Sequence, residues 1–170
     1  NTDDHGTHVA GIVAARTNNA VGVAGGAGRA KFVPIRFWGS GLWTSTVIFN
    51  SFKYATDIGC KIVTVSYNID EFVNDNLYLQ AINYMYDNGV IHINSDGNSG
   101  FQNPVRLKLD QTLYVSATDA ADVRSNFSNY GLGIDISAPG SSIYSTSMGA
   151  SITTPSYENK GGTSMSAPNV

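Results

Sequence analysis

Short apolar runs, separated by helical or polar stretches, constrain the fold of this chain more than any other feature. Strands buried on both faces have continuous apolar sequences, and parallel strands need long crossover connections, usually helical. The alternation therefore predicts an α/β fold with a mostly parallel sheet and helices on both faces. The predicted strands are residues 30–37, buried on both faces, and residues 61–67, 90–94, 113–117 and 134–137.

Three helices are predicted from capping residues and glycine stops. The first begins at His5 as a tightly packed buried helix, N-capped by Asp3 or Asp4, with Gly6 and Gly11 allowing close backbone approach. The others span residues 44–58, capped by Thr44 or Ser45 and ending near Gly59, and residues 75–88, ending at Gly89. A polar turn is predicted at residues 125–131, and His92 is expected to be a core histidine.

Length and composition limit the function classes. The 170 residues suffice for one domain or part of one, and the net charge of −3 gives no electrostatic case for nucleic acid or an anionic membrane. No apolar run approaches the ~20 residues of a membrane span. Cys60 is the one cysteine, so an internal disulfide is excluded.

Ser164 is a candidate nucleophile because it lies among small residues at what is predicted to be the start of a helix. A serine hydroxyl needs a base, and His5 and His8, one turn apart near the other end of the chain, are the candidates. They do not indicate a metal site, because there is no His-Glu-x-x-His and no suitably spaced third ligand. Ser66, Asn98 and the turn at residues 39–41 fall at the carboxyl ends of predicted strands, where the active sites of parallel sheets collect.

The glycine-rich segment 16–29 lacks both Gly-Lys-Ser/Thr and Gly-x-Gly-x-x-Gly, which argues against a phosphate-binding loop. Its Thr17-Asn18-Asn19 start could lend oxygens to a hard cation, and a structural turn is the alternative.

Three stretches stand out when they are taken together: Asp4-His5-Gly6-Thr7-His8-Val9-Ala10-Gly11, Gly97-Asn98-Ser99-Gly100 and Gly162-Thr163-Ser164-Met165-Ser166-Ala167-Pro168. In this order along the chain they resemble the histidine motif, the oxyanion-hole asparagine motif and the nucleophile motif of the subtilisin-like serine peptidases. Two stretches between the last two motifs also look like that family.

The resemblance implies a serine endopeptidase that works through an acyl-enzyme and needs no cofactor for catalysis. Ser164 would be the nucleophile and His5 its base, with the Asn98 side chain and the Ser164 N–H forming the oxyanion hole. His8 would then be structural. The implied fold is α/β, three-layer and subtilisin-like, with a mostly parallel central sheet, incomplete at both ends. Residues 1–170 would form part of a catalytic domain, from the histidine motif to the serine motif.

The family's third triad member is an aspartate N-terminal to the histidine, and no residue precedes Asn1 to supply it. Asp3 and Asp4 are too close to His5 along the chain, so a capping role is favoured for them. We expect this piece alone to be inactive. A non-catalytic subtilase-like domain that binds or scaffolds peptides is the alternative function. A phosphate- or nucleotide-binding protein is disfavoured, because no glycine fingerprint is present.

The resemblance also implies further sites and properties. A peptide substrate would bind as an added strand between two segments, and a calcium ion would be held by Asn19 and by backbone oxygens of three other residues. The family default is a secreted protein, and we expect a monomer. The substrate-binding residues would be Ser66, Tyr67 and Asn68 on one side and Gly39, Ser40 and Gly41 on the other; the calcium ligands would be Thr17, Asn19, Val21 and Val23.

Overall fold

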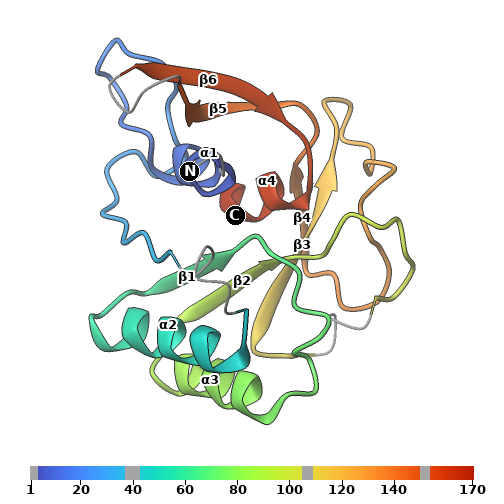
Figure 1. The fold of residues 1–170 in the computed structure, drawn as a ribbon. Coiled ribbons are helices and arrows are strands. Elements are labelled where there is room, and N and C mark those ends of the chain that lie inside the picture. Colours follow the sequence, from blue (N-terminus) through green and yellow to red (C-terminus); the bar gives the residue numbers. More distant parts are fainter. Residues whose placement is uncertain (1–3, 37–42, 105–108, 150–153) are drawn as a thin grey trace.

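The computed structural model describes residues 4–36, 43–104, 109–149 and 154–170 (Figure 1). β1, β2, β3 and β4 form a parallel sheet in that order, and β5 pairs antiparallel with β6 in a separate two-stranded sheet. The helices are α1 (His5–Ala14), α2 (Ser45–Asp57), α3 (Asn76–Asp87) and α4 (Thr163–Ser166), which continues into a 3₁₀ turn, η1 (Ala167–Asn169); the strands are β1 (Ile62–Val65), β2 (Ile91–Ser95), β3 (Thr112–Thr118), β4 (Ile136–Pro139), β5 (Ile143–Met148) and β6 (Pro155–Lys160).

The parallel sheet is the middle of three layers. Figure 1 shows α2 and α3 together on one side of it and α1 and α4 on the other, with the β5–β6 hairpin outside α1. The predicted α/β class and parallel sheet are therefore confirmed. Because all four strands run in the same direction, the carboxyl ends of β1, β2 and β4 lie along one edge of the sheet.

The larger hydrophobic core lies between the sheet and the α2–α3 pair. Phe52 from α2 and Tyr78 from α3 meet there, with ring centroids 6.3 Å apart. Full burial of each such side chain contributes on the order of 2 kcal/mol. Ile48, Ile69, Ile82 and Met85, all almost completely buried, complete its centre.

A smaller cluster on the opposite face of the sheet is made by Ile93, Val115 and Ala138 with Ala167 of η1. It fixes the C-terminal helical segment over the middle of the sheet. The segment that carries Ser164 is thereby attached to the sheet by apolar packing as well as by hydrogen bonds.

Two of the predicted helices begin and end as their sequences indicate. The Thr44 hydroxyl accepts a hydrogen bond from the Val47 N–H (3.3 Å), which caps α2. The Asp75 carboxylate accepts from Leu77 N (2.8 Å) and from the next amide, which caps α3. Gly59 and Gly89 follow the two helices with positive φ angles of 89° and 69°, a conformation that glycine adopts without steric cost.

The strand predicted at residues 30–37 is wrong for residues 30–36, and Phe37 lies outside the described residues. This segment is an exposed loop in which Phe32 and Val33 are 52% and 43% exposed. Among the described residues no strand pairs with it, and Pro34 has no N–H to donate to a ladder. The apolar sequence of this segment indicates that it could form a strand, but it does not indicate whether a neighbouring strand is present to pair with it.

The β5–β6 hairpin was not predicted. Its strands are rich in serine, threonine and charged residues, so they carry no continuous apolar signal. The hairpin lies against α1, where a Cβ on Gly11 would collide with the hydroxyls of Ser145 and Thr146. The close approach expected at Gly11 is therefore confirmed, and the atoms that come close are side-chain atoms of β5. The same expectation is wrong for Gly6, because a Cβ at that position would meet no atom within 4 Å.

Candidate active site

Ser164 lies in the first turn of α4, where it faces the residue that follows β1. The Ser66 hydroxyl donates to the Ser164 carbonyl oxygen (2.9 Å), and the Ser164 hydroxyl donates to the Ser66 carbonyl oxygen (3.2 Å). This reciprocal pair joins residues 98 positions apart. It places the predicted nucleophile at the carboxyl-terminal edge of the sheet.

Asn98 follows β2 and reaches the same place through Thr163. Its Oδ1 accepts hydrogen bonds from the Thr163 backbone N–H (2.8 Å) and from the Thr163 hydroxyl (3.0 Å). Because the side-chain oxygen is occupied, the exposed amide of Asn98 keeps its two Nδ2–H donors for a ligand. The role of Thr163 was missed, although it stands within the recognised nucleophile motif; its hydroxyl also accepts from Gly97 N (3.1 Å).

The loop that carries Asn98 is fixed by Asn129, which lies in the confirmed polar turn 125–131. The Asn129 Nδ2 donates to the Asp96 carbonyl oxygen (2.6 Å), and its Oδ1 accepts from the amides of Ser99 (3.2 Å) and Phe101 (2.9 Å). Asn129 is almost completely buried. The Asn129 side chain thus fixes the backbone on both sides of Asn98.

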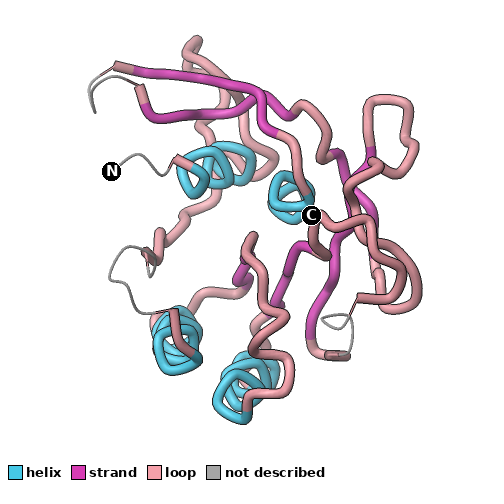
Figure 2. Tube along the Cα trace, turned by 45° about the vertical axis from the view of Figure 1, so that its right-hand side comes forward, coloured by secondary structure: helices cyan, strands magenta, loops and turns pink. Residues whose placement is uncertain are grey.

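His5 begins α1, and α1 contacts α4 in the structure. The two helices lie side by side in both views (Figures 1 and 2). The helices that carry the predicted base and nucleophile are therefore neighbours, although their residues lie at opposite ends of the chain.

His8 is completely buried, and its Nε2 lies 3.1 Å from the Glu158 carbonyl oxygen of β6. This contact fits the structural role expected for His8, because it joins α1 to the hairpin.

Asp4 occupies the N-cap position of α1, but its side chain makes no cap hydrogen bond. The expected capping by Asp4 is therefore wrong; Asp3 lies outside the described residues. The carboxylate instead contacts Lys160 Nζ (2.9 Å) and accepts from the Ser147 hydroxyl (2.7 Å). The neighbouring side chains of Glu158, Lys160 and Ser147 together hold the pKa of the Asp4 carboxyl well below its usual range.

The predicted substrate-binding residues divide between two environments. Ser66 is hydrogen-bonded to Ser164, and Asn68 is exposed. The Tyr67 ring, in contrast, packs edge-on against the Trp43 ring beside the larger core, with ring centroids 5.0 Å apart. Burial raises the pKa of the Tyr67 hydroxyl well above its usual value, although part of the residue remains exposed. Gly39, Ser40 and Gly41 lie outside the described residues, so substrate binding by either segment stays a prediction.

The predicted calcium loop, residues 17–23, is a tight surface turn. Asn18, Ala20 and Gly22 have positive φ angles, and the Asn19 Oδ1 accepts from the Val21 N–H (3.1 Å). Its oxygens suit a hard cation in type, but the loop contains no carboxylate. In the part of the chain that the structure describes, no group of three His, Cys, Asp or Glu side chains could hold a metal. Calcium binding stays a prediction.

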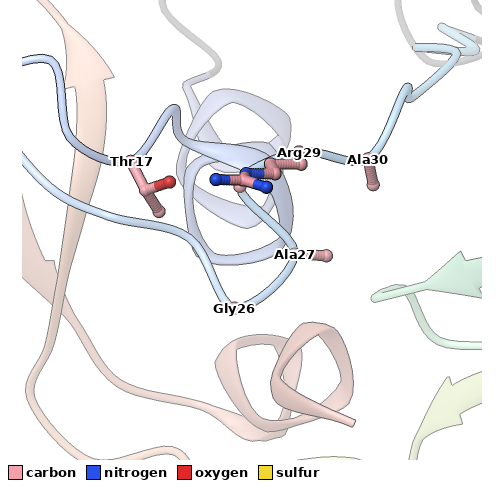
Figure 3. Close-up of a pocket in the computed structure, with 6 residues that line it drawn as sticks. Thr17, Gly26, Ala27, Arg29 and Ala30 are labelled. Atoms are coloured by element: carbon pink, nitrogen blue, oxygen red, sulfur yellow. The ribbon is translucent and has the colours of Figure 1, made fainter.

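Next to this loop, a pocket of about 350 Å³ opens beyond the C-terminal end of α1 (Figure 3). The backbone around it caps the helix, since the Gly26 and Ala27 amides donate to the carbonyl oxygens of Ile12 and Val13. Apart from Thr17, the pocket contains none of the predicted site residues. Its lining residues are Thr17, Gly26, Ala27, Gly28, Arg29 and Ala30.

Within residues 4–36, 43–104, 109–149 and 154–170, every helix is too short or too polar to cross a membrane.

Comparison with known proteins gives a consistent result. The model of the subtilase family of S8 peptidases matches residues 1–170. Thermitase of Thermoactinomyces vulgaris is 38% identical over 174 residues, which cover 100% of this chain and 59% of thermitase. An extracellular protease of Xanthomonas campestris is 37% identical over 98% of this chain and 31% of its own length. A solved protease of Pseudoalteromonas arctica superposes with a TM-score of 0.81 at 30% identity, covering 97% of this chain and 55% of that one. The chain thus spans less than two thirds of each of these proteins.

Proposed function

The chain belongs to the subtilase family, and on this premise we propose that the protein is a serine endopeptidase that hydrolyses peptide bonds through an acyl-enzyme intermediate. The observation that carries the proposal is the convergence of Ser164, Ser66 and Asn98 at one edge of the sheet. Ser164 and Ser66 are joined directly by hydrogen bonds of 2.9 and 3.2 Å, and Asn98 is joined to Thr163, the residue before Ser164, at 2.8 and 3.0 Å. The protease names of its relatives support the same chemistry.

In the proposed reaction the Ser164 oxygen attacks the carbonyl carbon of the scissile peptide bond, and His5 takes the hydroxyl proton. The hydroxyl must first turn away from the Ser66 carbonyl oxygen, to which it donates in this structure. His5 then gives the proton to the leaving nitrogen as the C–N bond breaks. Water, activated by the same imidazole, releases the acyl group from Ser164 in the second half.

The oxyanion of each tetrahedral intermediate would be held by the Asn98 Nδ2–H and the Ser164 N–H. The proposal is supported by the orientation of Asn98, because Thr163 occupies its oxygen and not its nitrogen. Donors fixed before the reaction stabilise the developing charge without further reorganisation. In subtilisin, loss of the asparagine donor lowers kcat by about 10²–10³, and we expect a similar loss here.

The aspartate that orients the histidine would lie outside this chain. Asp4 is a poor candidate, since both of its carboxylate oxygens are engaged by Lys160 and Ser147. A non-catalytic subtilase-like domain that binds or scaffolds peptides remains the alternative function, and no specific contact in the site favours it.

Proteins or peptides are the proposed substrates, and we expect a secreted monomer. The name of the Xanthomonas relative, an extracellular protease, supports the proposed location.

The first test is active-site labelling of the full-length protein with a fluorophosphonate, which reacts with an activated serine. We expect labelling of the wild type and none of the Ser164→Ala variant, because only the Ser164 oxygen can form the covalent bond. Mass spectrometry of the labelled peptide identifies the residue. Ser166→Ala, which removes another hydroxyl from the same helix, is the matched control and should still be labelled.

Equal labelling of wild type and Ser164→Ala would refute Ser164 as the nucleophile. An unlabelled wild type that still binds peptides would favour the non-catalytic alternative.

A further inference from the structure

Four side chains form a polar cluster where the start of α1 meets the hairpin: Asp4, Ser147, Glu158 and Lys160. We call it the α1–hairpin cluster. Lys160 Nζ lies 2.9 Å from Asp4 Oδ1 and 2.8 Å from Glu158 Oε1. The Ser147 oxygen lies 2.7 Å from Asp4 Oδ2 and 2.8 Å from Glu158 Oε1. One cation and one hydroxyl thus bridge two carboxylates.

The cluster joins the two segments that carry the proposed catalytic residues. Asp4 directly precedes His5, and Lys160 is the last residue of β6, four positions before Ser164. The two partners are 156 residues apart in sequence. The pair therefore joins a residue next to the proposed base to a residue four positions from the proposed nucleophile.

Between Lys160 and α4 stand Gly161 and Gly162, the most permissive link the backbone allows. Gly162 has a φ of 151°, and its N–H donates to the Gly140 carbonyl oxygen (2.8 Å). On the far side Thr163 is held by Asn98. These two hydrogen bonds fix the diglycine link in place, so a displacement of β6 relative to α1 also displaces the start of α4.

Further contacts between the hairpin and α1 run along the first turn of the helix. The Ser145 hydroxyl donates to the His8 carbonyl oxygen (2.8 Å), and the Thr146 hydroxyl donates to the Thr7 carbonyl oxygen (2.7 Å). With Ser147, which bonds to the Asp4 carboxylate, three consecutive residues of β5 thus contact the start of α1. They fix how far the hairpin can slide along α1.

We propose that Asp4 and Lys160 are positioning residues: their ion pair holds β6 against the start of α1 and so sets the separation of the His5 imidazole and the Ser164 hydroxyl. Neither side chain takes part in the proposed bond-making and bond-breaking steps. This role rests on the proposed function, since it assigns geometry to that same site. Hydrogen bonds to Glu158 and Asp4 raise the pKa of Lys160, so the ion pair is intact at neutral pH.

The test replaces Lys160 in the full-length protein and separates kcat from KM on a peptide substrate. Lys160→Met keeps the length of the side chain but removes the charge, and we expect kcat to fall about tenfold with KM changed less than about twofold. The melting temperature should change little, because partly exposed ion pairs contribute little stability. Lys160→Arg should restore most of kcat.

Lys53→Met is the matched control. It removes the same charge from an ion pair of 2.6 Å with Asp57, on α2 across the sheet. We expect it to leave kcat and KM unchanged. Asp4→Asn should reproduce the Lys160→Met effect, and the double variant should be no worse than either single one, because both remove the same interaction.

Two failures can be told apart. If Ser164→Ala abolishes activity but Lys160→Met and Asp4→Asn keep kcat within about twofold of the wild type, the positioning role is refuted and the proposed function stands. If the wild type shows no activity that depends on Ser164, the proposed function fails and the positioning role fails with it. Should Lys160→Met not fold, the near-isosteric Asp4→Asn variant decides by the same comparison of kcat.

Discussion

At the scale of single residues, His92 shows how burial sets the protonation of an imidazole. Its Nδ1 lies 2.9 Å from the Thr112 hydroxyl on the neighbouring strand, and its ring centroid lies 5.2 Å from that of Phe52. Burial lowers the pKa of His92 from 6.5 to about 3, because the charged ring would lose its hydration there. The core histidine expected from the sequence is confirmed.

This shift predicts acid sensitivity. The pKa of His92 is lower in the folded than in the unfolded protein, so the unfolded state binds the proton more tightly between pH 6.5 and about 3. The contribution of His92 to stability is complete above pH 6.5 and decreases as the pH falls, by roughly 1.4 kcal/mol per unit. We expect His92→Gln to flatten this part of the profile, measured by urea unfolding of the full-length protein from pH 7.5 to 4.5.

The stability of each protein is compared with its own value at pH 7.5, which removes any pH-independent loss of stability caused by the substitution. Parallel pH profiles for the wild type and His92→Gln would contradict a neutral buried imidazole.

Single residues also differ in whether their place in the site could be recognised from the sequence. Ser164, His5 and Asn98 stand in contiguous motifs, so their types and order were visible in the sequence. Asp4 is the first residue of the histidine motif and Lys160 lies two positions before the nucleophile motif, and no pattern links the two. Their contact could not be predicted, because nothing local indicates that two charges 156 residues apart will meet.

At the scale of elements, α1 carries two glycines with opposite surroundings. Gly11 faces β5, where the Ser145 and Thr146 hydroxyls are held in place by the carbonyl oxygens of His8 and Thr7. Gly6 is exposed and has open space at its Cβ position. Helix propensity favours alanine at both positions, and only packing distinguishes them.

We therefore expect opposite effects from one substitution. Gly11→Ala should lower the free energy of unfolding by about 1–3 kcal/mol through overpacking against the hairpin. Gly6→Ala should leave it unchanged or raise it by up to about 1 kcal/mol. Thermal or urea unfolding of the two variants measures this. Equal destabilisation by both would show that the hairpin does not press on α1.

The β5–β6 hairpin is the element that sequence patterns missed. Its inward positions are filled by hydroxyl side chains, which bond to helix carbonyl groups where apolar side chains would ordinarily pack. Such a strand has no hydrophobic alternation to detect. Conversely, residues 30–36 have an apolar sequence and form no strand, because pairing requires a neighbour and cannot be judged from one segment.

At the scale of the whole molecule, the predicted calcium loop offers a test by metal removal. A cation that binds the folded protein alone stabilises it, so we expect a calcium chelator to lower the melting temperature of the full-length protein. Asn19→Ala, which removes the predicted side-chain ligand, should melt lower in calcium and lose its response to the chelator. Differential scanning calorimetry measures both.

An unchanged melt of the wild type with chelator would exclude a stabilising calcium ion. A chelator effect that persists in Asn19→Ala would assign the ion to another part of the protein.

By itself the sequence determined the α/β class, the strands β1 to β4 within a few residues, three helices and the residues of the three motifs. These features depend on local periodicity, caps and short contiguous patterns, which each segment carries independently of the rest. Only the tertiary structure decided that the hairpin covers α1, that Thr163 orients Asn98 and that Lys160 meets Asp4. Those are contacts between distant segments, and their energy exists only once the sheet has brought the two ends of the chain together.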